Sequence, residues 1–271
     1  MFRWGNMNID RKEQMKLISL IVVLAIILLF IGYIMVGYIN SKKVDNPKVT
    51  ITLKNKGQIV LELYPNIAPN TVANFLALVN SGYYNDKIVY GKDINVIHFG
   101  RSKDGQESPA KLKDIGINEN GNGEEKYSIK GEFKKNGITN DLQHKKYVVS
   151  MSRADYTQII GSLKTQSYNS ANGLFNIVME EDTALDGNYA AFGKVIKGQE
   201  ILDKLFKEDT VVKEDKDNRL LLKRFKNVVE IEKVETDSKV LPKVDWIKAF
   251  DLDKFLTEEF KKQDQKSKGK N

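Results

Sequence analysis

The segment from Asn169 to Gly198 constrains the fold more than any other part of this 271-residue chain. It contains two apolar runs, Leu174–Met179 and Tyr189–Ile196, separated by a polar turn and an Asp186-Gly187 corner. Apolar runs on both sides of Asp-Gly are typical of strands joined by a tight turn, because glycine adopts positive φ without steric cost. Gly193 inside the second run indicates a β-bulge or a close approach of another backbone. The segment is therefore predicted to form a compact β-rich element.

Three blocks of the sequence, taken in order and spacing, resemble the cyclophilins, the β-barrel peptidyl-prolyl isomerases. The first block is ITLKNKGQIVLELYPNIAPNTVANFLALVNSGYY at Ile51–Tyr84. The second is IKGEFKKNGITNDLQH at Ile129–His144, which leads to VVSMSRA at Val148–Ala154. The third is the segment described above, with NSANGLFNIVM followed by LDGNYAAFGKVIKG. The resemblance covers about residues 48–235.

This resemblance implies a mainly β fold with helices. The expected architecture is a closed eight-stranded antiparallel barrel, capped by two helices and preceded by one transmembrane helix. The local patterns agree with it, because Val49–Leu53 and Ile59–Leu63 alternate as a hairpin and Pro69–Asn80 has apolar residues at helical spacing. We expect Ile59, Phe75 and Phe192 to share one core.

The remaining parts of this region have weaker patterns. Residues 88–100 are strand-like with an interruption at Gly91-Lys92-Asp93, and residues 101–126 and 155–168 are predicted to be loops. Gln199–Phe206 is predicted to be a helix, Lys207–Asn218 a charged insertion, and Val228–Val234 the closing strand.

An uncharged apolar run, Leu17–Tyr38, precedes this region. A bilayer core of about 30 Å needs about 20 apolar residues in a helix, so the run is long enough to span it. A cleaved signal peptide is the alternative, but the run ends in Val-Gly-Tyr-Ile-Asn-Ser, which is a poor cleavage site. We therefore expect an uncleaved single-pass anchor in the cell membrane. Because large domains translocate largely regardless of charge, we place the N-terminus in the cytoplasm and the domain outside it.

These observations predict five parts along the chain. They are a cytoplasmic N-terminal segment (1–16), a transmembrane helix (17–38), a linker (39–47), a cyclophilin-like domain (48–236) and a C-terminal helical extension with a disordered tail (237–271).

Composition narrows the chemistry. The chain has no cysteine, which excludes disulfides and cysteine-based metal sites. The net charge of +7 could serve an anionic surface, but a lysine-rich solvated surface is the simpler interpretation. No aromatic-basic motif suggests nucleic-acid binding, and no P-loop, dinucleotide fingerprint or Gly-x-Ser-x-Gly is present.

Prolyl isomerisation itself needs no cofactor or metal. Its barrier of about 20 kcal/mol is rotation about a partial double bond. A catalyst must favour the twisted amide, through an apolar pocket for the proline ring and a donor aimed at the prolyl nitrogen. The expected partners are thus proline-containing polypeptide clients and, through one span, the membrane.

In the family, the donor is an arginine in a Phe-His-Arg-like run. The corresponding residues are Val89-Tyr90-Gly91, so Gly91 stands at the arginine position and no catalytic residue is secure. Lys92 and His98 are the candidate substitute donors. A side chain at Lys92 would point to the opposite face of an extended strand unless a bulge redirects it. His98 could equally be a hydrogen-bonded wall residue.

The peptide-binding groove is carried over from the family's motifs position by position. Asn95 and Asn176 stand at positions of pocket aromatics, and Val96 stands at that of a methionine. Leu185 retains the pocket leucine, whereas His144 matches a histidine outside the pocket. The predicted groove residues are Asn95, Val96, His98, Ser152, Arg153, Leu174, Asn176, Leu185 and Tyr189.

The C-terminal extension carries an apolar stripe on one or two predicted short helices. Docking on the barrel is the favoured interpretation, and recruitment of a partner is the alternative. The stripe consists of Trp246, Ile247, Phe250, Phe255, Leu256 and Phe260, and residues 265–271 are predicted to be disordered.

The sequence thus predicts a cyclophilin-type peptidyl-prolyl cis-trans isomerase that assists the folding of exported proteins at the outer face of the membrane. The alternative is a weak or inactive cyclophilin-like binding module or chaperone for extended proline-containing segments. A structural anchor that recruits a partner through its C-terminal stripe is a third possibility.

Overall fold

The computed structural model describes residues 11–41, 46–104, 106–215, 220–238 and 243–268. The chain divides into two compact units, Met1–Asp45 and Asn46–Asn271. Parts of the predicted N-terminal segment, linker and C-terminal tail (residues 1–10, 42–45 and 269–271) lie outside the described residues.

The first unit contains one helix, α1 (Arg11–Ser41). Residues Arg11–Met35 are long and apolar enough to cross a bilayer by length and composition, a criterion that a signal sequence near an N-terminus also meets. The large apolar side chains described along it are exposed, from Leu17 to Met35. The helix begins before the predicted span and extends past it, because its polar flanks at Arg11–Lys16 also adopt helical structure.

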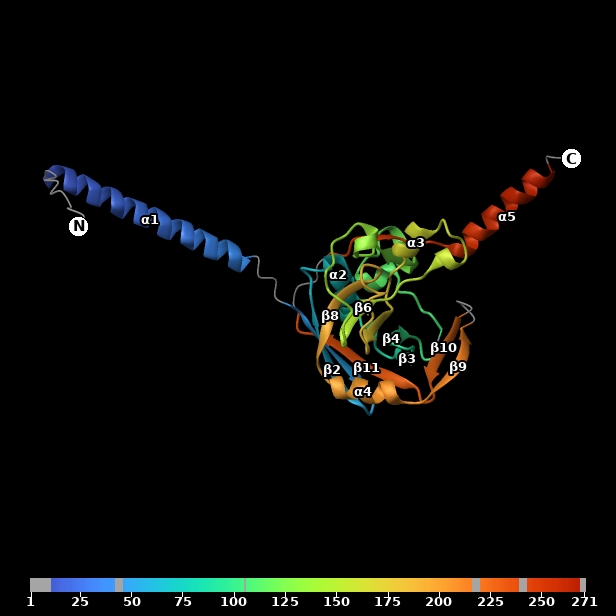
Figure 1. The fold of residues 1–271 in the computed structure, drawn as a ribbon. Coiled ribbons are helices and arrows are strands. Elements are labelled where there is room, and N and C mark those ends of the chain that lie inside the picture. Colours follow the sequence, from blue (N-terminus) through green and yellow to red (C-terminus); the bar gives the residue numbers. More distant parts are fainter. Residues whose placement is uncertain (1–10, 42–45, 105, 216–219, 239–242, 269–271) are drawn as a thin grey trace, which may run out of the picture. The chain divides into compact units, whose positions relative to one another are not determined.

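The second unit is built on a closed antiparallel barrel whose strands follow the order β1-β11-β3-β4-β7-β6-β8-β2 (Figure 1). The predicted eight-stranded barrel is therefore confirmed. Its strands are β1 (Lys48–Leu53), β2 (Gly57–Leu63), β3 (Ile88–Lys92), β4 (Val96–Arg101), β6 (Val148–Met151), β7 (Phe175–Val178), β8 (Ala190–Lys197) and β11 (Val229–Thr236).

Two helices close the barrel at opposite ends, α2 (Pro69–Asn80) and α4 (Gln199–Lys207) (Figure 1). Both contribute side chains to the main core, including Phe75 from α2 and Leu202 from α4. The N-terminus of α2 is held by the buried Glu132, whose carboxylate accepts the Asn70 N–H at 3.0 Å and the Thr71 N–H at 2.7 Å. A carboxylate at this position satisfies free helix N–H groups and interacts favourably with the helix dipole.

The barrel interior is filled by a cluster of aromatic rings. Phe75 lies 5.1 Å from Phe175, 5.2 Å from Phe192 and 5.2 Å from Tyr84 between ring centroids. Phe175 also stacks on Phe99 at 4.9 Å. Ile59, Phe75 and Phe192 are all fully buried in this one cluster, as predicted.

Gly193 lies where two strands approach closely. A Cβ at this position would lie 2.6 Å from the Glu62 carbonyl oxygen of the neighbouring strand β2. The close approach expected from the sequence is confirmed, and it explains why a glycine interrupts an otherwise apolar strand.

Several segments differ from the sequence prediction. The predicted charged insertion, Lys207–Asn218, contains a strand, β9 (Thr210–Asp215), which pairs with β10 (Leu220–Phe225) just beyond it, and β10 lies along β3. The predicted loops contain the 3₁₀ helices η1 (Leu112–Ile115), η2 (Glu119–Glu124) and η4 (Tyr156–Gln158) and the helix α3 (Lys164–Tyr168). Such short polar elements have no amphipathic period, so hydrophobic patterning does not detect them.

The C-terminal extension also differs. Its first part is a strand, β12 (Trp246–Lys248), which pairs with β5 (Tyr127–Ile129) outside the barrel. A single helix, α5 (Leu252–Lys268), follows and includes residues 265–268, which the sequence predicted to be disordered. Trp246 packs against the main core and Phe250 lies 5.3 Å from Tyr156, so this part of the stripe docks on the domain. Phe260 is 65% exposed and takes no part in the docking.

Replacement of Phe175 by alanine tests the aromatic cluster. Loss of a buried phenylalanine and the cavity left behind should lower the free energy of unfolding by about 3–5 kcal/mol. Phe260→Ala is the matched control and should change it by less than about 0.5 kcal/mol, because the side chain lies on the surface. Urea unfolding of the full chain, followed by near-ultraviolet circular dichroism, measures both. Equal losses in the two variants would contradict the proposed core.

Candidate functional site

Three of the predicted groove residues lie in adjacent strands, Val96 and His98 in β4 and Asn176 in β7. The others lie in the flanking segments, next to the ends of β4, β6 and β7 or before β8: Asn95, Ser152, Arg153, Leu174, Leu185 and Tyr189. His98 pairs with Asn176 across β4 and β7, and Asn176 pairs with Ser150 across β7 and β6. The neighbouring pair Phe99 and Phe175 lies in the barrel core. Because successive strand residues alternate between faces, His98, Asn176 and Ser150 belong to the outward face.

The His98 ring is held from two sides. Its Nε2 lies 3.1 Å from the Asp93 carboxylate, and its ring stacks on Tyr90 at 5.4 Å. The Arg101 guanidinium lies over the Tyr90 ring, 4.8 Å from its centroid. It also forms an ion pair with Glu107. The contact with Asp93 engages Nε2, so Nδ1 is the ring nitrogen that His98 could offer to a ligand.

Asn176 makes the middle of the groove polar. Its Nδ2 donates to the Ser152 Oγ at 3.3 Å, while its Oδ1 is buried without a hydrogen-bond partner. An unpaired buried acceptor costs about 1–3 kcal/mol, so this amide is not a stabilising substitute for an aromatic ring. Asn176 thus departs from the dry apolar floor that the resemblance implies.

One end of the groove remains apolar. Val96 and Leu185 pack together in a cluster separate from the main core, with Val148, Val178, Ala191 and Leu142. Beside it, the Asn95 Nδ2 donates to the Asp182 carboxylate at 2.9 Å. This bond ties the start of β4 to the turn that carries Leu185.

The other end is built around Arg153. Its guanidinium lies over the rings of Tyr189 at 4.5 Å and Tyr168 at 5.1 Å, and its Nε donates to the Asn188 carbonyl at 3.1 Å. The Arg153 side chain therefore has a structural role, because it holds these neighbouring residues together. The backbone N–H and C=O of Arg153 make no hydrogen bond within the described part of the chain, so both are available to an extended ligand. The preceding residue, Ser152, donates its N–H to the Leu174 carbonyl at 3.0 Å.

The two candidate donors behave differently. Gly91 pairs with His98, so the position assigned to the family's arginine faces outward but has no side chain. Lys92 pairs with the core residue Ile97 on the opposite face, and its ammonium donates to the carbonyl oxygens of Phe206 and Glu208 at the end of α4. The two register shifts in β3, between Ile88 and Val89 and between Val89 and Gly91, lie before Lys92 and do not turn this lysine toward His98.

A Ser-His-Asp chain lies beneath the groove. The His144 Nε2 is 2.9 Å from the Ser150 Oγ, and its Nδ1 is 2.9 Å from the Asp186 carboxylate. Ser150 is 0% exposed, so no substrate carbonyl can reach its hydroxyl and the chain is not a nucleophilic triad. Asp186 also accepts the His144 backbone N–H at 2.8 Å. The hydrogen bonds among Ser150, His144 and Asp186 therefore fix the turn next to Leu185.

Sequence reasoning missed the residues that support the groove, among them Tyr90, Asp93, Arg101 and Asp182. All four lie close in sequence to predicted groove residues, but their partners are set by strand register and by a turn. The only signal in the sequence is the interruption at Gly91-Lys92-Asp93. It separates Tyr90 from His98 and could have suggested that the two residues stack. Among the described residues, no group of three His, Asp or Glu side chains is placed to hold a metal ion.

The closed barrel and its two end helices define a cyclophilin-type β-barrel. A family model described as cyclophilin type peptidyl-prolyl cis-trans isomerase/CLD matches residues 48–236. The chain therefore belongs to this family.

Individual relatives agree. A peptidyl-prolyl cis-trans isomerase of Arabidopsis thaliana is 32% identical over 150 residues, which cover 55% of this chain and 56% of that protein. The chain thus spans little more than half the length of this relative. A probable peptidyl-prolyl cis-trans isomerase of Brucella suis is 28% identical over 170 residues, covering 60% of this chain and 74% of the relative. The crystal structure of a Cryptosporidium parvum cyclophilin type isomerase has the same fold, with a TM-score of 0.51, 21% identity and coverage of 72% of this chain and 99% of that chain.

The stability of the domain should depend on pH through His144. Burial lowers the pKa of its imidazole, and the Asp186 carboxylate only partly opposes that shift. The unfolded chain, with a histidine pKa of about 6.5, then binds a proton that the folded chain does not. The free energy of unfolding should therefore fall as the pH drops below about 6.5 toward the lower pKa of the folded state.

Urea unfolding of the full chain and of His144→Gln at about pH 7.5 and about pH 5.5 measures this contribution. The parent chain should lose more stability on acidification than the variant, which lacks the titrating ring. An identical loss in both would mean that His144 does not contribute.

Proposed function

We propose that this chain is a cyclophilin-type peptidyl-prolyl cis-trans isomerase that acts on proline-containing segments of polypeptides. The observation that carries the proposal is the closed barrel in a domain that belongs to the isomerase family, with His98 and Asn176 paired across its strands β4 and β7. An extended client would lie across the outward face of these strands, with its backbone paired to the free N–H and C=O of Arg153. The apolar end at Val96 and Leu185 would receive the proline ring.

Catalysis in this groove would depend on His98. Rotation is accelerated when a donor stabilises the prolyl nitrogen as it loses conjugation with the carbonyl. Gly91 supplies no donor, and the Lys92 ammonium is bound at the end of α4. His98, oriented by Asp93 and by its stacking on Tyr90, remains as the donor. We therefore expect weak isomerase activity that depends on His98.

A binding module or chaperone without significant catalysis is the second candidate. The polar groove floor at Asn176 favours it, because an unpaired amide oxygen is a poor wall for a proline ring. In this case the groove would hold extended proline-containing segments without accelerating their isomerisation.

The proposed location is the outer face of the cell membrane, where the domain would assist the folding of exported proteins. The apolar helix α1 supports a single-pass anchor with a cytoplasmic N-terminus. The proposed organisation is a cytoplasmic segment (1–16), a span (17–38), a linker (39–47), the cyclophilin-type domain (48–236) and a C-terminal extension (237–271).

Restoring the arginine tests the proposed groove. In the full chain, reconstituted in lipid nanodiscs, Gly91→Arg should raise kcat/KM for a proline-containing peptide by about 100- to 1,000-fold, because one directed donor contributes about 2.7–4 kcal/mol to transition-state stabilisation. His98→Ala should abolish the weak activity of the parent chain, whereas Lys92→Ala should leave it unchanged. A cis-trans isomerisation assay measures all three variants.

The outcomes separate the two candidates. Retained binding of the peptide without any rate enhancement in the parent chain supports the binding module. Activity that depends on Lys92 instead of His98 would contradict the assignment of the donor. Absence of both binding and activity, including in Gly91→Arg, would contradict the proposed function.

The orientation of the chain can be measured because it contains no native cysteine. A membrane-impermeant maleimide should label Lys164→Cys on intact cells, since this side chain is exposed on the domain. Asn8→Cys, at the other side of the proposed span, should react only after permeabilisation. The reverse pattern of labelling would contradict the proposed topology.

A further inference from the structure

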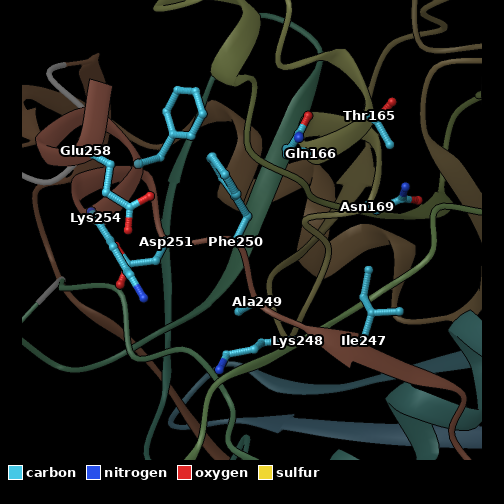
Figure 2. A pocket seen from close by; sticks show the side chains of 11 residues that line it. Thr165, Gln166, Asn169, Ile247, Lys248, Ala249, Phe250, Asp251, Lys254 and Glu258 are labelled. Carbon is cyan, nitrogen blue, oxygen red and sulfur yellow. The ribbon is translucent and has the colours of Figure 1, made fainter. Parts of the chain in front are cut away.

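A hollow of about 480 Å³ lies outside the barrel, between helix α3 and the C-terminal extension (Figure 2). Ile247, Phe250 and Phe255 form its apolar wall, and Thr165, Gln166 and Asn169 line the opposite side. The apolar wall lies beyond residues 48–236, the range matched by the family model. The hollow is therefore formed by residues from both inside and outside the matched range.

The walls of the hollow are held in place by packing and pairing. Phe250 lies 5.3 Å from Tyr156 and 5.6 Å from Phe255 between ring centroids. β12 is fixed by its pairing with β5. Ile247 nevertheless remains 39% exposed, so its side chain presents apolar surface to the hollow and to solvent.

The hollow is connected to the groove by a short, tethered segment. Arg153 belongs to the groove, and Tyr156, three residues later, packs against the wall residue Phe250. The intervening backbone is tied down, because Ser170 Oγ accepts the Ala154 N–H and Ser167 Oγ accepts the Tyr156 N–H, both at 2.9 Å. Three residues span at most about 10 Å. A client segment that lies along Arg153 can therefore reach the hollow within a few residues.

Charge and backbone both favour an extended, largely apolar occupant. The rim carries two basic side chains, Lys248 and Lys254, and two acidic ones, Asp251 and Glu258, so it does not select a strongly charged ligand. In the part of the chain that the structure describes, β12 has a neighbour, β5, on one edge only. Its free edge can pair with an extended backbone, as in other strand-addition complexes.

We propose that this hollow is a second subsite for the client polypeptide, which takes a large apolar side chain of the same extended segment that occupies the groove. The inference rests on the proposed function, because it needs a client in the groove. By the family resemblance, the stretch at Ser152 and Arg153 contacts the residue before proline, so the apolar side chain lies about three to five residues N-terminal to the proline. The two subsites together select clients that combine a proline with a preceding large apolar residue.

The test uses the full chain in lipid nanodiscs and four fluorescent peptides that contain one proline. Three carry a phenylalanine at the third, fourth or fifth position before the proline, and one carries serine at all three. At least one phenylalanine peptide should bind about tenfold more tightly than the serine peptide, because burial of an aromatic side chain contributes this much or more. Fluorescence anisotropy measures the four dissociation constants.

Variants of the hollow provide the controls. Phe255→Ala and Ile247→Ser should each remove the tenfold gain and leave the affinity for the serine peptide unchanged. Phe260→Ala, on the same helix but outside the hollow, should retain the gain. Ile247 is partly exposed, so its variant keeps the test valid if Phe255→Ala disturbs α5.

The failures are distinguishable. Equal binding of all four peptides would overturn the second subsite and leave the groove standing, as would a gain that persists in both hollow variants. Self-association of the parent chain that is lost in Phe255→Ala, without any effect of the peptides, would assign the hollow to a second copy and overturn the proposal. If none of the peptides binds, the proposed function fails together with the second subsite.

Discussion

The packing of Phe75 against Phe175 and Phe192 is the interaction on which the rest of the structure depends. It joins a helix that closes one end of the barrel to two strands from the C-terminal half of the domain. Aromatic rings of this size bury large apolar areas, and their tilted and edge-to-face geometry adds specificity to the packing. The register of β7 follows from it, because Phe175 can point inward only if Asn176 points outward. The core therefore determines which face of the barrel becomes the groove.

The proposed groove lies on a barrel typical of the family, but it contains the polar residues His98 and Asn176. Its ends are well defined, with the Val96 and Leu185 cluster on one side and the Arg153 backbone on the other. Between them lie His98, with its carboxylate partner, and Asn176, whose Oδ1 is buried without a hydrogen-bond partner. Burial of an unpaired polar atom is unfavourable for stability, so the domain tolerates Asn176 at some cost. Such local costs are most common at functional sites.

The C-terminal extension adds surface to the domain without changing the barrel. β12 and Phe250 anchor it, while Phe260 on α5 stays exposed. Part of the apolar stripe docks on the domain, because Trp246 packs against the main core and Phe250 against Tyr156. Ile247, Phe250 and Phe255 of the stripe also line a hollow.

The sequence predicted the helix at Pro69–Asn80 and the alternating strands from apolar periods, which are local properties of the chain. It predicted the closed barrel, and with it the shared core of Ile59, Phe75 and Phe192, only through its resemblance to a known family. The tertiary structure alone decided the partners of the polar groups. It directed the Lys92 ammonium to the end of α4, stacked His98 on Tyr90 and placed Glu132 at the start of α2. It also paired β12 with β5, two segments more than 100 residues apart. Such contacts depend on strand register and chain closure, which bring together residues that no local pattern relates.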